Sequence, residues 1–203
     1  METRPRPGRP REFDVDQALD AALEVFWRQG YEGTAISDLT TAMGINRPSL
    51  YGTYGNKAAL FEKVMERYAE QVTGYLAAAL ELPTSREVVR ALLVGVAENT
   101  TRPGRPRGCL SVQGALASSP AADGIRTGLN ARRAGLENAL RRRLAYSVAE
   151  HDLPAAADPA LLAKYVNTVF QGLAVQAAGG ASRPDLLAVI DVVLATWPEP
   201  HRH

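Results

Sequence analysis

Apolar residues recur at helical spacings of three and four along almost the whole chain, and period-two alternation is almost absent. This pattern predicts an all-α protein of about nine helices. The first predicted helix begins near Asp14 and closes at Gly30, and a long one runs from Lys57 to about Leu82. At 1.5 Å per residue the long helix spans roughly 38 Å, enough to join two domains rigidly.

The last two predicted helices, 158–178 and 184–197, are unusually apolar. A helix that is apolar around much of its circumference is buried on more than one side. Either one large core covers both helices, or they meet a second copy of the chain about a two-fold axis. We expect the dimer, because few other elements remain to cover them. The expected interface residues are Leu162, Val166, Val169, Leu173, Leu186, Ile190, Val193 and Trp197.

The segment from Thr34 to Lys57 predicts two short helices joined by a tight turn, followed by the start of a third. Thr34 is expected to cap the first short helix, and Gly44 can adopt the left-handed conformation that ends it. Asn46 is expected to cap the second, where a proline in the first turn is tolerated. This geometry is typical of a helix-turn-helix, whose second helix enters a DNA major groove.

Length, charge and cysteine content exclude several classes of protein. The chain has 203 residues and a formal net charge of +1. No apolar run is long enough to span a membrane, and no secretory signal is recognisable at the N-terminus. The single cysteine, Cys109, excludes an intramolecular disulfide. These features predict a cytoplasmic protein without a membrane partner.

The positive charge near the N-terminus lies in a proline-rich tail. Acidic residues outnumber basic ones between Glu12 and Leu60, which departs from a uniformly basic DNA-binding domain. The tail carries Arg4, Arg6, Arg9 and Arg11. It is either a solubilising terminus or an arm that enters a minor groove, and the adjacent helix-turn-helix favours the arm.

The sequence gives little support for an enzyme. Two of the three histidines lie in the last three residues, and no metalloprotease, paired-cysteine, serine-hydrolase or phosphate-loop motif occurs. We expect no catalytic residue, no metal site and no cofactor. A basic stripe is predicted on the helix near 119–150, at Arg132, Arg133, Arg141, Arg142 and Arg143. Such a run is usually a solvated face, and we interpret it so.

Two adjoining segments, FWRQGYEGTAISDLTTAMGI and NRPSLYGTYGNKAALF, resemble the DNA-binding signature of the tetracycline-repressor (TetR) family. The resemblance covers about 13–61. It implies a homodimer that binds a palindromic double-stranded DNA operator and leaves it when a small ligand enters the C-terminal core. It divides the chain into a basic arm (1–11), a DNA-binding domain (12–56) and a ligand-binding and dimerisation domain (57–198). A helical protein–protein adaptor without DNA binding is the alternative.

Carried over by position, the resemblance implies phosphate contacts from Thr34, Tyr51 and Lys57. Arg47, Pro48 and Ser49 would face base edges. Two departures stand out. Thr53 occupies a position that is commonly aromatic, so its reach to a phosphate is shorter, and Gly52 offers no side chain for base readout.

The effector is not readable from the sequence. The candidate pocket residues are Val72, Leu76, Leu93, Cys109, Val112, Gln113, Leu116, Tyr165 and Thr168. Few candidates are charged, so we expect an apolar or weakly polar compound. Cys109 follows a loop with three arginines at a predicted helix start, which favours a reactive thiolate. It is therefore either a sensor of electrophiles or oxidants or, as a free cysteine more often is, a small core residue.

Overall fold

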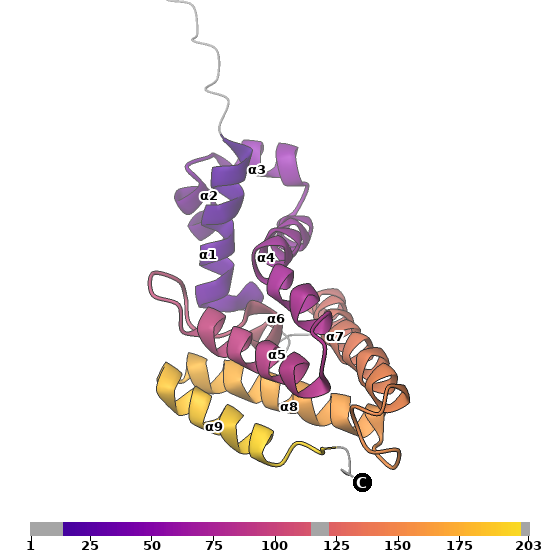
Figure 1. Cartoon of the computed structure of the whole chain (residues 1–203). Coiled ribbons are helices and arrows are strands. Elements are labelled where there is room, and N and C mark those ends of the chain that lie inside the picture. Colours follow the sequence, from indigo (N-terminus) through magenta and orange to yellow (C-terminus); the bar gives the residue numbers. More distant parts are fainter. Residues whose placement is uncertain (1–13, 115–121, 200–203) are drawn as a thin grey trace, which may run out of the picture.

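The computed structural model describes residues 14–114 and 122–199, and nine α-helices lie within these ranges. Figure 1 shows α1 to α3 at one end of the molecule, α8 and α9 as a layer at the other, and α4 leading from one toward the other. The predicted all-α class is confirmed. The helices are α1 (Val15–Gly33), α2 (Ile36–Met43), α3 (Arg47–Tyr54), α4 (Lys57–Leu80), α5 (Ser85–Thr100), α6 (Leu110–Gln113), α7 (Asp123–Ala149), α8 (Pro159–Ala178) and α9 (Arg183–Ala195).

Most predicted helix ends are set by the expected capping residues. Asp14 accepts from two first-turn amides of α1, and Asn46 Oδ1 accepts from the amide of Ser49 at 2.8 Å. Gly44 ends α2 with φ 67° and ψ 28°, the left-handed conformation. Gly30, with φ 71° and ψ 173°, interrupts the helical backbone within α1. The turn between α2 and α3 is therefore fixed by local chemistry.

Thr34 does not cap α2. Its side chain is buried, and its hydroxyl donates to the Gly30 carbonyl at 2.6 Å. Ala35 holds the N-cap position, and its amide donates to the carboxylate of Asp38, three residues later, at 3.0 Å. The turn opened by Gly30 draws Thr34 inward, so its hydroxyl satisfies a carbonyl there instead of a helix amide.

Aromatic side chains build the core at the N-terminal end. Phe26 of α1 meets Phe61 of α4 edge to face at 5.0 Å between ring centroids, and Tyr31 meets Phe61 at 5.2 Å. Leu39 of α2 and Leu50 of α3 are fully buried beside them. Because the first turns of α4 share this core while its later turns pack on α5, α4 belongs to both ends. The predicted division after residue 56 stays a prediction.

The C-terminal layer is held to the rest of the subunit along most of its length. α8 packs on α5 and α7, and α9 packs on α5. Trp197 donates its indole N–H to Ser85 Oγ at 3.1 Å, and Arg86 donates to the Leu194 carbonyl at 2.6 Å. None of the described helices is long and apolar enough to cross a bilayer.

This packing corrects the residues expected at a two-fold contact. The subunit's own core covers most of the predicted side chains, because α5 and α7 supply the apolar surface that the sequence left unassigned. Six are buried (Val166, Leu173, Leu186, Ile190, Val193, Trp197), and two are partly buried against the same core (Leu162, Val169).

A different apolar face remains exposed on these two helices. Of the eight large apolar side chains that are exposed in the described ranges, five lie on α8 and α9. We call them the C-terminal stripe. They are Leu161, Tyr165, Val175, Val189 and Val192.

The short helix before α7 begins at the predicted place. Cys109 holds the N-cap position of α6, and the helix covers Leu110–Gln113. Leu116, the start of the predicted helix near Ser119 and the arginines of the N-terminal arm lie outside the described residues.

Candidate nucleic-acid interface and ligand cavity

The exposed side chains of α3 form a compact surface at the N-terminal end. Leu50 faces the core and anchors the helix, while Arg47, Pro48 and Tyr51 point to solvent. Tyr51 is 46% exposed, and Arg47 forms no ion pair with another described residue. Thr53 is exposed and Ser49 is partly buried. These side chains are free to meet a partner because the helix is fixed by its cap and Leu50.

Lys57 is held at the first turn of α4. Its ammonium lies 4.5 Å from the centroid of the Tyr31 ring, a cation–π distance. Partial burial lowers the pKa of Lys57, while Glu32 and Asp38 nearby act in the opposite direction. The ammonium is positioned by the ring instead of moving freely, which suits a fixed phosphate contact.

Thr34 does not join this surface. Its burial and its bond to Gly30 remove the hydroxyl from solvent, so the implied phosphate contact does not fit the geometry of this side chain. Tyr54 also faces inward. Its hydroxyl is buried without a hydrogen-bond partner in the described structure, and burial raises its pKa.

Polar contacts connect α1 to the rest of the molecule. Arg67 of α4 binds Asp20 of α1 through two hydrogen bonds, at 2.8 and 3.1 Å. The guanidinium lowers the pKa of the Asp20 carboxyl, since it stabilises the charged form. Further along α1, Trp27 donates its indole N–H to the Gly108 carbonyl at 3.1 Å. The loop before α6 is thus bonded directly to the helix that supports the helix-turn-helix.

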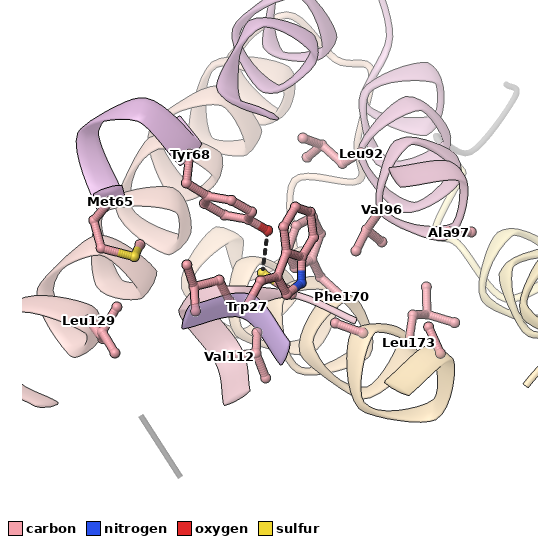
Figure 2. Close-up of a cluster of buried hydrophobic side chains, with 14 of the residues drawn as sticks. Trp27, Met65, Tyr68, Leu92, Val96, Ala97, Val112, Leu129, Phe170 and Leu173 are labelled. Atoms are coloured by element: carbon pink, nitrogen blue, oxygen red, sulfur yellow. Dashed lines mark hydrogen bonds between the residues drawn. The ribbon is translucent and has the colours of Figure 1, made fainter. Parts of the chain in front are cut away.

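A cavity of about 250 Å³ lies among α4, α6, α7 and α8. Four of its lining residues, Met65, Tyr68, Val112 and Phe170, are labelled among the buried side chains in Figure 2. The lining is mostly apolar, as is usual for small-molecule sites. The residues that line it are Met65, Tyr68, Ala69, Leu76, Cys109, Ser111, Val112, Arg132, Arg133, Leu136, Asn167, Phe170 and Gln171.

The predicted pocket residues divide into two groups. Leu76, Cys109 and Val112 line the cavity. The others described do not, because helical spacing cannot tell which side of each helix faces the hollow. Leu93 is fully buried in packing, Gln113 lines a separate hollow against α1, Val72 packs against the core outside the cavity, and Tyr165 and Thr168 are exposed on α8.

Sequence reasoning missed the polar side of the cavity. Arg132 and Arg133 were interpreted as a solvated stripe, yet both line the cavity together with Asn167 and Gln171. Arg143, in the same run, donates to the carbonyls of Leu80, Leu82 and Pro83 and so closes the C-terminal end of α4. The run of arginines on one helix is compatible with a solvated face and with a cavity wall, so the sequence offered no signal that separates the two.

Cys109 contacts the cavity but is largely covered. It is 8% exposed, and its Sγ accepts a hydrogen bond from the Tyr68 hydroxyl at 3.2 Å, drawn as the dashed line in Figure 2. Burial raises the pKa of that hydroxyl well above its usual value. This geometry favours the packing interpretation of Cys109, although a molecule inside the cavity would touch the thiol. In the described ranges no three histidine, cysteine or acidic residues gather to hold a metal ion.

Comparisons with known proteins match both ends of the chain. The family profile "Bacterial regulatory proteins, tetR family" matches residues 18–64, and "Tetracyclin repressor-like, C-terminal domain" matches residues 74–183. The Escherichia coli transcriptional repressor ComR is 33% identical over 194 residues, which are 95% of this chain and 92% of ComR.

Solved structures agree. A cysteine mutant of the regulator CifR, complexed with 26-base-pair operator DNA, is 40% identical, with a TM-score of 0.89, over 94% of this chain and 100% of that one. A TetR regulator from Rhodococcus sp. RHA1 is 43% identical, with a TM-score of 0.63, over 92% and 100%.

Proposed function

The chain belongs to the tetR family of bacterial regulatory proteins, and on that premise we propose that it is a homodimeric transcriptional repressor. It binds a palindromic operator and leaves the DNA when a small molecule fills the cavity among α4, α6, α7 and α8. The observation that carries the proposal is the exposed surface of α3, with Arg47 and Tyr51 exposed on a helix that Asn46 caps and that Leu50 anchors in the core. We place this activity in the cytoplasm and assign no catalytic reaction to it.

In the proposed complex α3 lies in the major groove. Arg47, Pro48 and Ser49, at its N-terminal end, face base edges, where an arginine reads guanine best. Tyr51, Thr53 and Lys57 flank them and contact phosphates. The arm carrying Arg4, Arg6, Arg9 and Arg11 supplies the positive charge that 12–60 lacks and follows a minor groove.

The C-terminal stripe supplies the proposed two-fold contact. Leu161, Tyr165 and Val175 repeat on one face of α8, and Val189 and Val192 are exposed on α9, which contacts α8. Two copies packed through these faces form a four-helix contact. The dimer then presents two α3 helices to successive major grooves, roughly 34–36 Å apart.

Release follows from a population shift. A ligand between α4 and α7 favours the conformers in which these helices are held apart, and α4 carries that difference to the N-terminal core through Phe61 and Lys57. The Trp27 bond to Gly108 gives the loop before α6 a second route to α1.

The test is binding of the full chain to duplexes from the region upstream of its own gene, over a salt series and without ligand. We expect tight binding to one duplex and weak binding to random DNA. Lys57→Ala should weaken both and reduce the salt slope by about one. Lys63→Ala is the control, since Lys63 lies on the same helix and pairs with Glu66 at 2.9 Å. A chain that shifts no DNA even at low salt is the adaptor instead.

A further inference from the structure

The cavity carries positive charge on one wall while the rest of its lining is apolar. Arg132 and Arg133 are consecutive on α7, and both line the cavity together with Met65 and Phe170. Arg133 is half-buried, so its guanidinium loses part of its hydration and needs a counter-charge or several hydrogen bonds, whereas Arg132 stays more exposed. The question is therefore what neutralises the two guanidinium groups.

No carboxylate among the described residues pairs with Arg133. Its Nη1 donates to Gln171 Oε1 at 3.1 Å, and its Nη2 donates to Asn130 Oδ1. Both partners are neutral amides, and no salt bridge within 4.0 Å involves this guanidinium in the described ranges. The protein therefore orients the Arg133 guanidinium through two neutral amides without pairing it with a described carboxylate.

Arg132 is only weakly paired. Its Nη2 lies 3.4 Å from Glu62 Oε2, and the two side chains are 37% and 47% exposed. Exposed pairs of this kind contribute little and exchange readily with other anions. Arg132 can therefore release Glu62 to bind a stronger acceptor.

The nearest other acid on α7 is already engaged. Glu137, one turn beyond Arg133, accepts from Asn167 at 3.0 Å and pairs with Lys164 at 3.1 Å. These two contacts lower the pKa of Glu137, so it stays charged, and Lys164 offsets that charge. The wall around Arg133 is therefore net positive.

The space beside the charge is small and apolar. One water molecule occupies roughly 30 Å³ in the liquid. A cavity of 250 Å³ therefore holds about eight groups of that size. A guanidinium binds carboxylate by two parallel hydrogen bonds, a geometry that neutral groups do not match.

We propose that this cavity binds an amphipathic anion, an aliphatic carboxylate of about eight carbons in all, with its head group on Arg133 and Arg132 and its apolar chain against Met65 and Phe170. The proposal rests on the proposed function in that the cavity is the effector site. It replaces the expectation of an apolar or weakly polar compound.

The test is calorimetric titration of the full chain, without DNA, with octanoate, octanamide and octylammonium. These probes share a chain length and differ in head-group charge. Octanoate should bind about tenfold more tightly than octanamide, the factor that one charge-assisted hydrogen-bonded contact supplies, and octylammonium should bind most weakly.

Substitutions test whether the two arginines of the cavity wall cause the preference for octanoate. Arg133→Gln should lose about tenfold in octanoate affinity and keep octanamide affinity within about twofold. Arg132→Gln gives a smaller loss in the same direction. Arg142→Gln is the matched control, because Arg142 is exposed on the same helix and does not line the cavity. Circular dichroism checks that each variant is folded.

Equal affinity of the wild type for octanoate and octanamide overturns the proposal whatever the variants do, and so does failure of all three probes to bind. Neither outcome touches the DNA experiment, which uses no ligand. Conversely, if the chain binds octanoate through Arg133 but shifts no DNA, the proposed repressor function is wrong and the proposed anion site is still supported.

Discussion

Helix α3, which we propose enters the major groove, and helix α8 are held in opposite ways. α3 has eight residues, one buried side chain and a cap from Asn46. α8 has twenty residues, and seven of them are buried against α5 and α7. A helix with so little core contact leaves its side chains free for a partner, whereas a helix so deeply packed fixes the fold. Substitutions should therefore separate binding from stability according to the end at which they fall.

The largest effects are expected from substitutions at two neighbouring residues of α9, one buried and one exposed. Val193 is 3% exposed and Val192 is 65% exposed. Val193→Arg buries an unpaired charge in the subunit's own core and should cost about 3–5 kcal/mol of unfolding free energy. Val192→Arg should keep the helical circular dichroism and yield a monomer on size-exclusion chromatography. A stable Val192→Arg dimer would move the proposed contact away from the C-terminal stripe.

At the other end, Arg47→Ala should alter recognition without altering the fold. Discrimination between operator and random duplex should fall by about 1–3 kcal/mol if Arg47 reads a base. The unfolding free energy should stay within about 0.5 kcal/mol of wild type, because the side chain is exposed. Fluorescence anisotropy with both duplexes, together with urea unfolding, measures the two quantities. Unchanged discrimination would remove Arg47 from base readout.

Packing between α4 and α5 can be tested at a glycine. A Cβ added at Gly95 would lie 2.2 Å from a ring carbon of Tyr75, so the ring must move. Gly95→Ala should destabilise by about 1–3 kcal/mol through overpacking. Gly135→Ala on α7 is the control. No atom lies within 4 Å of its added Cβ, and helix propensity alone should stabilise it by about 0.5–1 kcal/mol. Thermal unfolding of both variants compares them.

The smallest expected effect concerns Asp20, which joins α1 to α4 through Arg67. Its pKa is lowered in the folded state, so its contribution is present above the usual carboxyl pKa and is lost as the pH falls through the lowered value. Asp20→Asn should cost no more than about 1 kcal/mol at pH 7, because the Asp20 side chain is 46% exposed.

The difference from wild type should shrink when unfolding is repeated near pH 3. Glu24→Gln, which breaks an exposed pair with Arg28 inside α1, is the control for the charge change. If the difference in unfolding free energy between Asp20→Asn and wild type stays the same at acid pH, the ion pair with Arg67 is not its cause.

Local signals made the N-terminal end predictable from the sequence. Asn46 and Gly44 act within four residues of their own position, so the cap and the turn follow from the residues themselves. Thr34 was misplaced because its partner, the Gly30 carbonyl, became available only through the turn at Gly30.

The C-terminal end depends on distant neighbours. α8 is apolar on two sides, and nothing within it says which side meets α5, so Val166 and Leu173 were assigned to the wrong surface. The roles of Arg132 and Arg133 were hidden for the same reason, since α4 and α8 bring the other cavity walls to them from far along the chain.

The placement of the two tryptophans gives the molecule built-in optical reporters. Trp27 meets Tyr68, a cavity residue, edge to face at 5.0 Å, while Trp197 is bonded to Ser85 between α9 and α5. Replacing Trp197 with phenylalanine would leave Trp27 as the one indole. Its fluorescence would then report changes where the cavity meets α1. Rapid mixing could then time the signal's arrival at α1 and compare it with the departure of labelled DNA.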